Sequence, residues 1–335
     1  YMNPNEPKST QLILEVKGGG WGIQDISPDG KQLVIGEYVS INESYLWLLD
    51  IATGKLTEIS DRNSKGVSQS DATFSNVPHE IWFLTDKDNE FERLASMNLK
   101  TKKTTYYTST IPWNVENYDV SEDKKSIVFI TNEAGLNKMY LMNTATKAYK
   151  EVKNLPIGLI SDARFTKNNQ NIFFNQSTAQ SASDVYQLNI QTGKTNRWTE
   201  SELGEMQPSD MSVPKFIEWK SFDDLKISGF YYPASPKFKG KRPVIIMIHG
   251  GPEGQTMASF LGTNNFYTNE MGVSVVYPNV RGSSGFGKTY LAKDNGFLRE
   301  DSVKDIGALL DWIAKQPDLD KDKIMIMGRS YGGYM

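Results

Sequence analysis

The chain has 335 residues, more than one typical domain of about 100–200 residues needs. Hydrophobic residues make up 38% of it and charged residues 23%, which supplies enough apolar material for a sizeable core and argues against wholesale disorder. Lysine and arginine total 37 against 40 aspartates and glutamates, so no basic excess points to nucleic acid or an anionic membrane as the main partner. We therefore expect a soluble globular protein of two domains.

Neither membrane insertion nor cysteine chemistry is expected. The longest apolar run, residues 244–248, is far shorter than the ~20 residues of a membrane-spanning helix. Cysteine is absent, which excludes disulfides, thiolate metal sites and a cysteine nucleophile and is compatible with either cytoplasm or periplasm. The sequence leaves the compartment and the oligomeric state open.

One motif recurs through the first two hundred residues with a period of about 46. A turn-like segment starts four times at spacings of 48, 45 and 46, at Asp50, Asn98, Asn143 and Asn189. A second series keeps the same period and precedes an apolar run each time, at Asp25, Asp71, Asp119 and Asp162. Internal repetition of this length is typical of arrays and propellers.

Each repeat is expected to form four short antiparallel strands. The apolar runs cover residues 32–38, 80–85, 126–131 and 171–175, and further strands are expected at 45–51, 91–99, 139–143 and 185–190. Four short strands per 40–50 residues is the pattern of a β-propeller blade. A β-sandwich is the alternative, but it has no reason to repeat one motif in phase four times.

The phase of the repeat also suggests where the domains begin and end. Asn3 lies 47 residues before Asp50, so residues 1–16 are expected to be the end of an earlier blade, with further blades outside this sequence. We predict a partial β-propeller of four blades plus part of another over residues 1–199. A linker containing two prolines follows over 200–214, and an incomplete α/β-hydrolase domain over 215–335.

The last third of the chain has the rhythm of an α/β protein. Strands are expected at 216–220 and 226–232, and buried strands at 242–248, 272–277 and 323–327. A helix over 300–316 would place five apolar side chains on one face, namely Val303, Ile306, Leu309, Leu310 and Ile313. Strand, helix and strand in this order predict a parallel sheet, whose ligands bind at the carboxyl ends of the strands.

A nucleophile elbow follows the last of these strands. Residues 328–332 read Gly-Arg-Ser-Tyr-Gly, which matches the G-x-S-x-G pattern of α/β-hydrolases and makes Ser330 the candidate nucleophile. Small residues are needed because the serine is held on a strained turn, where a bulky neighbour would collide with the adjacent strand and helix. The alternative is an ordinary glycine-rich turn between strand and helix.

His249, Gly250 and Gly251 follow the strand at 242–248, where hydrolases of this fold place one N–H of the oxyanion hole. We choose the N–H groups of Gly251 and Tyr331 as the two donors. His249 is not expected to be the base, because in this fold the triad acid and histidine follow the serine. The only other histidine is His79, so this fragment alone is expected to be nearly inactive.

A competing motif runs from Gly282 to Lys288 and Thr289 and satisfies the phosphate-binding pattern G-x-x-x-x-G-K-[ST]. Four residues separate its first glycine from the expected strand, and no apolar strand ends in the acid that would hold magnesium. The acids at 318, 320 and 322 resemble a calcium loop but lack its glycine and its bidentate glutamate. We expect neither a metal nor a cofactor.

Three motifs, at residues 249–252, 279–287 and 328–335, follow propeller repeats in one order, and together they resemble the prolyl oligopeptidase family of serine peptidases. The elbow looks most like the acylaminoacyl-peptidase and dipeptidyl-peptidase-like branches. The resemblance implies a propeller that caps the hydrolase domain, peptide substrates and no cofactor. It also places the loop with Arg281 near the active site, together with His249 and Gly250. Some members carry a tyrosine at the position of His249, so only the backbone donor at Gly251 is carried over.

The sequence is also compatible with three other functions. The protein could be a catalytically silent propeller scaffold, an NTPase that uses Lys288, or a lipase or esterase that shares the elbow. The residue preference of a peptidase, and whether it acts at chain ends or internally, cannot be read from the sequence.

Overall fold

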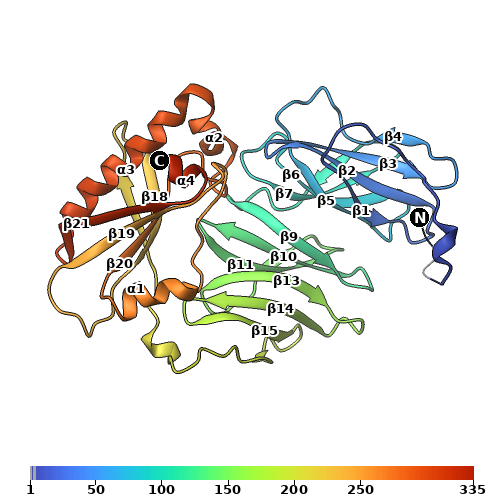
Figure 1. Cartoon of the computed structure of the whole chain (residues 1–335). Helices are drawn as coiled ribbons and strands as arrows, with labels where there is room; N and C mark the ends of the chain where they lie inside the picture. Colours follow the sequence, from blue (N-terminus) through green and yellow to red (C-terminus); the bar gives the residue numbers. More distant parts are fainter. Residues whose placement is uncertain (1, 3–4) are drawn as a thin grey trace. The chain divides into compact units, whose positions relative to one another are not determined.

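The structure is a computed structural model that describes Met2 and residues 5–335 (Figure 1). Asn3, which marks the expected earlier repeat, lies outside the described residues. By its internal contacts the chain divides into two compact units, one ending at Val115 and the other beginning at Glu116. Within the described residues, no helix combines the length and the apolar character needed to cross a membrane.

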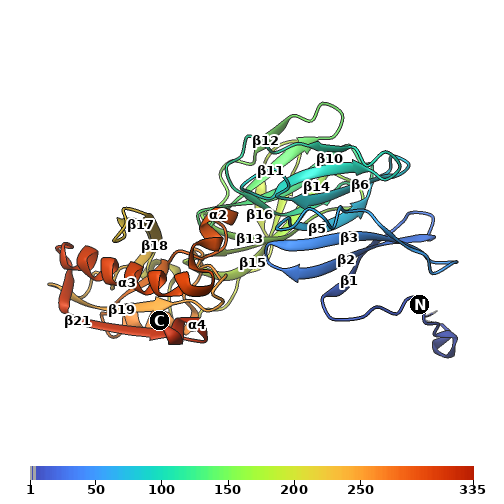
Figure 2. The ribbon, with the colours of Figure 1, turned by 90° about the horizontal axis from the view of Figure 1, so that it is seen from above.

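The first unit contains two four-stranded antiparallel sheets in the order β1-β2-β3-β4 and β5-β6-β7-β8. The strands of the first are β1 (Trp21–Ile26), β2 (Gln32–Ser40), β3 (Glu43–Asp50) and β4 (Leu56–Glu58), and Figure 2 shows β1, β2 and β3 side by side. Those of the second are β5 (Gln69–Phe74), β6 (Glu80–Thr85), β7 (Arg93–Asn98) and β8 (Thr104–Tyr106). Val34, Leu46, Ile81, Phe83 and Ala95 form the core between the two sheets.

The segment before β1 does not form the strand expected near the start of the chain. A short 3-10 helix, η1 (Pro7–Ser9), is followed by residues 10–16 without regular structure. Ile13 and Leu14 nevertheless pack against buried Leu33, Ile35 and Leu49 of the first sheet. Their apolar character is thus explained by packing on this sheet, without a strand partner among the described residues.

The second unit begins with two further sheets of the same kind, in the order β9-β10-β11-β12 and β13-β14-β15-β16. Their strands are β9 (Asn114–Val120), β10 (Ser126–Glu133), β11 (Leu136–Asn143), β12 (Tyr149–Glu151), β13 (Gly158–Phe165), β14 (Asn171–Thr178), β15 (Ser181–Asn189) and β16 (Thr195–Arg197). All eight strands expected from the two apolar series are present. The four open sheets confirm the prediction of propeller blades.

The regular spacing of the repeat has a physical cause in the turns. The side chains of Asp50, Asn98, Asn143 and Asn189 each accept a hydrogen bond from a threonine N–H three residues later, at 2.9–3.0 Å. This local bond closes the turn between the third and fourth strand of each four-stranded sheet. The second series joins sheets, because Asp119 Oδ2 accepts from Phe165 N of the following sheet at 2.8 Å.

The remainder of the second unit is a five-stranded sheet in the order β17-β18-β20-β19-β21. Its strands are β17 (Lys215–Lys220), β18 (Lys226–Tyr232), β19 (Arg242–Ile248), β20 (Ser274–Asn279) and β21 (Leu319–Gly328). β19 runs parallel to both neighbours, whereas β17 and β18 are antiparallel. This mixed sheet, with a parallel pair at the site, is the start of the expected hydrolase domain.

Helices cover both faces of this sheet (Figure 1). The 16-residue helix α3 (Arg299–Ala314) buries Ile306, Leu309 and Ile313 against Val244 and Ile246 of β19. The short helix α1 (Asn265–Asn269) lies on the other face, beside β20. Other short helical segments are η2 (Pro208–Asp210), η3 (Gly262–Asn264), α2 (Lys288–Leu291), η4 (Ala292–Asp294), η5 (Gly296–Leu298) and α4 (Tyr331–Tyr334).

Two expectations about burial are wrong. Leu310 is 36% exposed and Val303 only half-buried, because the buried stripe of α3 is completed by Ser302 and Asp305. The strand expected to be buried at 323–327 is an edge strand in which Met325 is 55% and Ile326 47% exposed. Within the described residues β21 pairs only with β19, so one edge of its backbone has no strand beside it.

Candidate active site

Ser330 stands on the sharp turn between β21 and α4. Its backbone has φ 57° and ψ −122°, a conformation that side-chain-bearing residues rarely adopt, and the residue is exposed. Strain of this kind persists only where the surroundings impose it, and it concentrates at functional sites. The turn therefore has the backbone geometry of a nucleophile elbow.

The two glycines of the motif are required by close approach of the backbone. A Cβ on Gly328 would lie 2.1 Å from the carbonyl oxygen of Gly332, and one on Gly332 would lie 2.2 Å from that of Ile248. Both distances are far below van der Waals contact, so neither position accepts a side chain. The motif spacing thus follows from the packing of α4 against β21 and β19.

The loop after β19 lies beside the serine, as the sequence predicts for an oxyanion loop. A Cβ on Gly250 would approach Ser330 Cβ to 3.3 Å and Ser330 Oγ to 3.9 Å. Gly251 follows with φ 140° and is exposed. Tyr331 is the first residue of α4, so its N–H has no acceptor within that helix. The structure therefore brings the segments of both expected donors together around Ser330.

The two ring nitrogens of His249 contact Ser283 and Gly250. Its Nε2 lies 2.8 Å from Ser283 Oγ, and its Nδ1 lies 2.9 Å from the carbonyl oxygen of Gly250. Burial lowers the pKa of His249, which favours the neutral ring. With both ring nitrogens engaged elsewhere, the histidine holds the loop after β20 in place.

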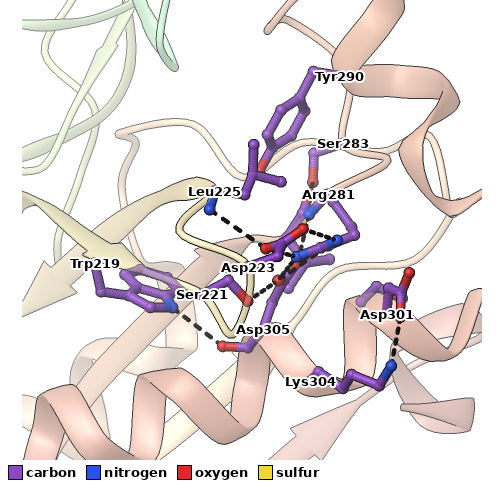
Figure 3. A network of polar contacts seen from close by, with 12 residues as sticks. Trp219, Ser221, Asp223, Leu225, Arg281, Ser283, Tyr290, Asp301, Lys304 and Asp305 are labelled. Atoms are coloured by element: carbon purple, nitrogen blue, oxygen red, sulfur yellow. Dashed lines mark hydrogen bonds and ion pairs between the residues drawn. The ribbon is translucent and has the colours of Figure 1, made fainter.

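Arg281 belongs to a buried ionic network (Figure 3). Its NH2 lies 2.8 Å from Asp305 Oδ1 and 2.9 Å from Asp223 Oδ1, and its backbone N–H donates to Asp305 Oδ2 at 2.9 Å. Burial alone would lower the pKa of Arg281, but these ion pairs raise it above its ordinary value. Ser221 Oγ also donates to Asp305, so Arg281 fixes the loop after β20 on α3 and on the β17–β18 turn.

The phosphate-binding pattern does not form a phosphate-binding loop. β20 ends at Asn279, so two residues, and not the expected four, precede Gly282. The N–H groups of Gly282, Ser283 and Ser284 donate to the carbonyl oxygens of Tyr290, Val280 and Gly254. These donors are consumed within the protein, whereas a P-loop directs its N–H groups at phosphate. Among the described residues no three acidic or histidine side chains gather as a metal site.

An open cavity of about 710 Å³ lies next to the elbow. Its lining includes Met247, His249 and Tyr277 together with Gly328 and Gly332 of the elbow. The lining is mostly apolar. Space for a substrate side chain is therefore present beside the candidate nucleophile.

Sequence reasoning missed the buried polar residues around the elbow. Asp294, Ser302 and Asp305 are completely buried, and Tyr331 is only 8% exposed. Ser302 and Asp305 were visible in the sequence as polar positions within the apolar stripe of α3. A buried polar position on a helix needs a partner, and that was the available signal.

Comparison with known proteins shows the family of the chain. The model of the prolyl oligopeptidase N-terminal β-propeller domain matches residues 5–201, and that of the prolyl oligopeptidase family matches 258–335. Dipeptidyl-peptidase 5 of Porphyromonas gingivalis is 24% identical over 334 residues, covering 93% of this chain and 47% of that protein. Dipeptidyl aminopeptidase BIII of Pseudoxanthomonas mexicana is 36% identical over 92 residues, 28% of this chain and 13% of that protein.

Solved structures show the same fold. A structure from a study of two prolyl endopeptidases has a TM-score of 0.84 and 16% identity, covering 98% of this chain and 48% of that one. The structure of a puromycin hydrolase has a TM-score of 0.82 and 16% identity, covering 92% of this chain and 49% of that one. The elbow and the sheet define the beginning of an α/β-hydrolase domain, preceded by propeller blades. The chain belongs to the prolyl oligopeptidase family and spans about half the length of the relatives it matches over most of its own length.

Proposed function

We propose that the protein is a serine peptidase that hydrolyses oligopeptides through an acyl-enzyme on Ser330. The observation that carries the proposal is the strained, exposed backbone of Ser330 next to Gly250. Family membership adds support, because the relatives' names describe peptidases. The proposal includes a propeller over residues 1–199, a linker over 200–214 and a catalytic domain over 215–335.

In the proposed reaction, Ser330 Oγ bonds to the carbonyl carbon of the scissile amide while its proton passes to a histidine. The N–H groups of Gly251 and Tyr331 donate to the oxyanion, and each such donor contributes on the order of 3 kcal/mol to transition-state stabilisation. The C–N bond then breaks, the histidine returns the proton to the leaving amine, and water hydrolyses the ester. His249 is hydrogen-bonded to Ser283, and His79 lies exposed in the other unit. We therefore assign the role of general base to a histidine outside these 335 residues.

Fluorophosphonate labelling tests the nucleophile in the full-length protein as its gene encodes it. We expect covalent labelling of the wild type, none of Ser330→Ala, and normal labelling of Ser183→Ala, whose exposed serine lies in β15. A folded protein that stays unlabelled would favour the catalytically silent scaffold. Cleavage of acyl esters without cleavage of peptide amides would favour an esterase.

A further inference from the structure

The Tyr331 hydroxyl lies in the middle of a chain of buried hydrogen-bonding groups. It is 3.1 Å from Asp294 Oδ2 on one side and 2.5 Å from Ser302 Oγ on the other. Ser302 Oγ in turn lies 2.6 Å from the carbonyl oxygen of Arg299. Three contacts therefore join Asp294, at the end of η4, to the first turn of α3.

The number of protons available for these three contacts depends on whether Asp294 is ionised. The two hydroxyl groups carry one proton each, and the Arg299 carbonyl carries none. With an ionised Asp294, Tyr331 must donate to the carboxylate, and the single Ser302 proton cannot serve both of its own contacts. With a neutral Asp294, the acid donates to Tyr331, Tyr331 to Ser302, and Ser302 to the carbonyl oxygen of Arg299. Only the neutral acid gives each contact one proton.

The surroundings of Asp294 also disfavour a charge. The residue is completely buried, and its Oδ1 has no hydrogen-bond partner among the described residues. An unpaired carboxylate oxygen is far more costly to bury than an unpaired carbonyl oxygen of a neutral acid. Gly282 packs directly on this group, since a Cβ there would lie 2.1 Å from Asp294 Cγ.

Four charged or titratable groups face Asp294, namely Tyr331, Arg299, Glu253 and His249. Arg299 would favour its ionised form, but the guanidinium lies over the Tyr331 ring and its Nε donates to the Asp294 backbone carbonyl, not to the carboxyl group. Glu253 opposes ionisation, and the fourth group is His249, whose buried ring favours its neutral form. Burial is the largest effect, and it raises the pKa of Asp294 above its ordinary value.

We propose that Asp294 is a neutral carboxylic acid in the folded protein and donates its proton to the Tyr331 hydroxyl, as the first member of a relay through Ser302 to the Arg299 carbonyl. The relay fixes the ring of Tyr331 and thereby the backbone N–H of the same residue. Asp294 is thus a positioning residue. The effect on an oxyanion hole rests on the function proposed above, whereas the relay itself does not.

The pH dependence of stability tests the relay in the full-length protein. A carboxyl group whose pKa is raised on folding binds more protons in the folded than in the unfolded state, so it lowers stability as pH rises above the ordinary value of 3.8. Asp294→Asn keeps a donor toward Tyr331 and cannot ionise. We expect the difference in melting temperature, variant minus wild type, to rise with pH. At neutral pH the variant should melt at the same temperature as the wild type or higher.

Asp305→Asn is the matched control, because Asp305 is equally buried but faces Arg281. This variant is expected to melt several degrees below the wild type at neutral pH. If Asp294→Asn melts as low as Asp305→Asn at neutral pH, the carboxylate form is required. If its curve of melting temperature against pH runs parallel to that of the wild type, Asp294 binds no more protons in the folded than in the unfolded state. Either result refutes the relay.

Infrared spectroscopy reads the proton directly. At neutral pH the difference spectrum between the wild type and Asp294→Asn should contain the C=O stretching band of a protonated carboxyl, which Tyr331→Phe should shift without abolishing. Absence of the band would overturn the proposal.

The labelling rate of Ser330 then separates the two proposals. Tyr331→Phe loses a buried hydrogen bond and is expected to label about tenfold more slowly, and Asp294→Asn is expected to slow labelling less. An intact relay in a protein that never labels would refute the proposed function alone. Labelling without the infrared band would refute the relay alone.

Discussion

Removal of the Asp305 carboxylate should release the loop after β20 from α3. Asp305 has no exposed side-chain surface, and Arg281 is 4% exposed. The carboxylate accepts bonds from the backbone N–H, Nε and NH2 of Arg281, as well as from Ser221 Oγ. Asp305→Ala therefore leaves a guanidinium and a hydroxyl buried without their main acceptor.

The magnitude follows from the burial of the pair. Removing one partner of a buried ion pair costs about 3–5 kcal/mol, because the other charge stays in a medium that solvates it poorly. Here Asp223, whose side chain is 42% exposed, still binds Arg281 from the solvent side. We therefore expect the low end of the range, about 3 kcal/mol.

Hydrogen exchange of the α3 amides measures this loss where it occurs. A loss of about 3 kcal/mol corresponds to roughly hundredfold faster exchange for amides that exchange through opening of this helix. Asp311→Ala is the control on the same helix, since Asp311 is exposed and should change stability by no more than about 0.5 kcal/mol. Replacing both partners, as Arg281→Met with Asp305→Leu, should restore much of the protection.

Two results would refute this reasoning. One is exchange in Asp305→Ala within a few-fold of the wild type, which would mean that Asp223 alone compensates the guanidinium. The other is a double variant that exchanges faster than Asp305→Ala, which would mean that the pair contributes more than the burial of its charges explains.

Three further predictions concern the turn, the blades and the oxyanion loop. Gly332→Ala should abolish labelling of Ser330 and lower the melting temperature, since its Cβ would lie 2.2 Å from the Ile248 carbonyl oxygen; normal labelling would contradict the elbow geometry. Burial opposes ionisation of Asp184, but hydrogen bonds from serine, arginine and threonine side chains lower its pKa to about 2. Its stabilisation, of order 2 kcal/mol, should therefore be lost as pH falls from about 4 to 2, and acid titration of Asp184→Asn should lack that step. Asn132→Ala removes a 2.6 Å hydrogen bond from Asn132 Nδ2 to Gln255 Oε1, so a protease should cut residues 250–258 faster than in the wild type. Equal cleavage rates would show that this hydrogen bond does not hold the loop.

Much of the fold could be predicted because its signals are local. An aspartate or asparagine that closes a turn, as Asn98 does, needs only a residue three positions later. Strands such as β18 and β19 were placed at their observed bounds, since alternation and continuous apolar runs report burial directly.

The parts that could not be predicted depend on residues far apart in the chain. Ser302 and Asp305 interrupt the apolar stripe of α3, and the sequence does not show that Tyr331 and Arg281 are their partners. The P-loop pattern fails for a related reason, because the residue types do not reveal that the N–H of Ser284 already donates to Gly254. Exposure of Ile326 likewise follows from which strand lies beside β21.

Asp294 and Asp305 show how far the partner decides the role of a buried acid. Both are completely buried, and an arginine contacts each of them, Arg299 in the case of Asp294 and Arg281 in the case of Asp305. Arg281 directs three nitrogens at the carboxylate of Asp305, whereas Arg299 covers the Tyr331 ring and contacts only the backbone of Asp294. The first acid is therefore needed as an anion and the second as a proton donor. Asp305→Asn removes a charge that Arg281 needs, whereas Asp294→Asn preserves a donor toward Tyr331. The different melting temperatures expected of the two variants at neutral pH therefore follow from the geometry of their partners.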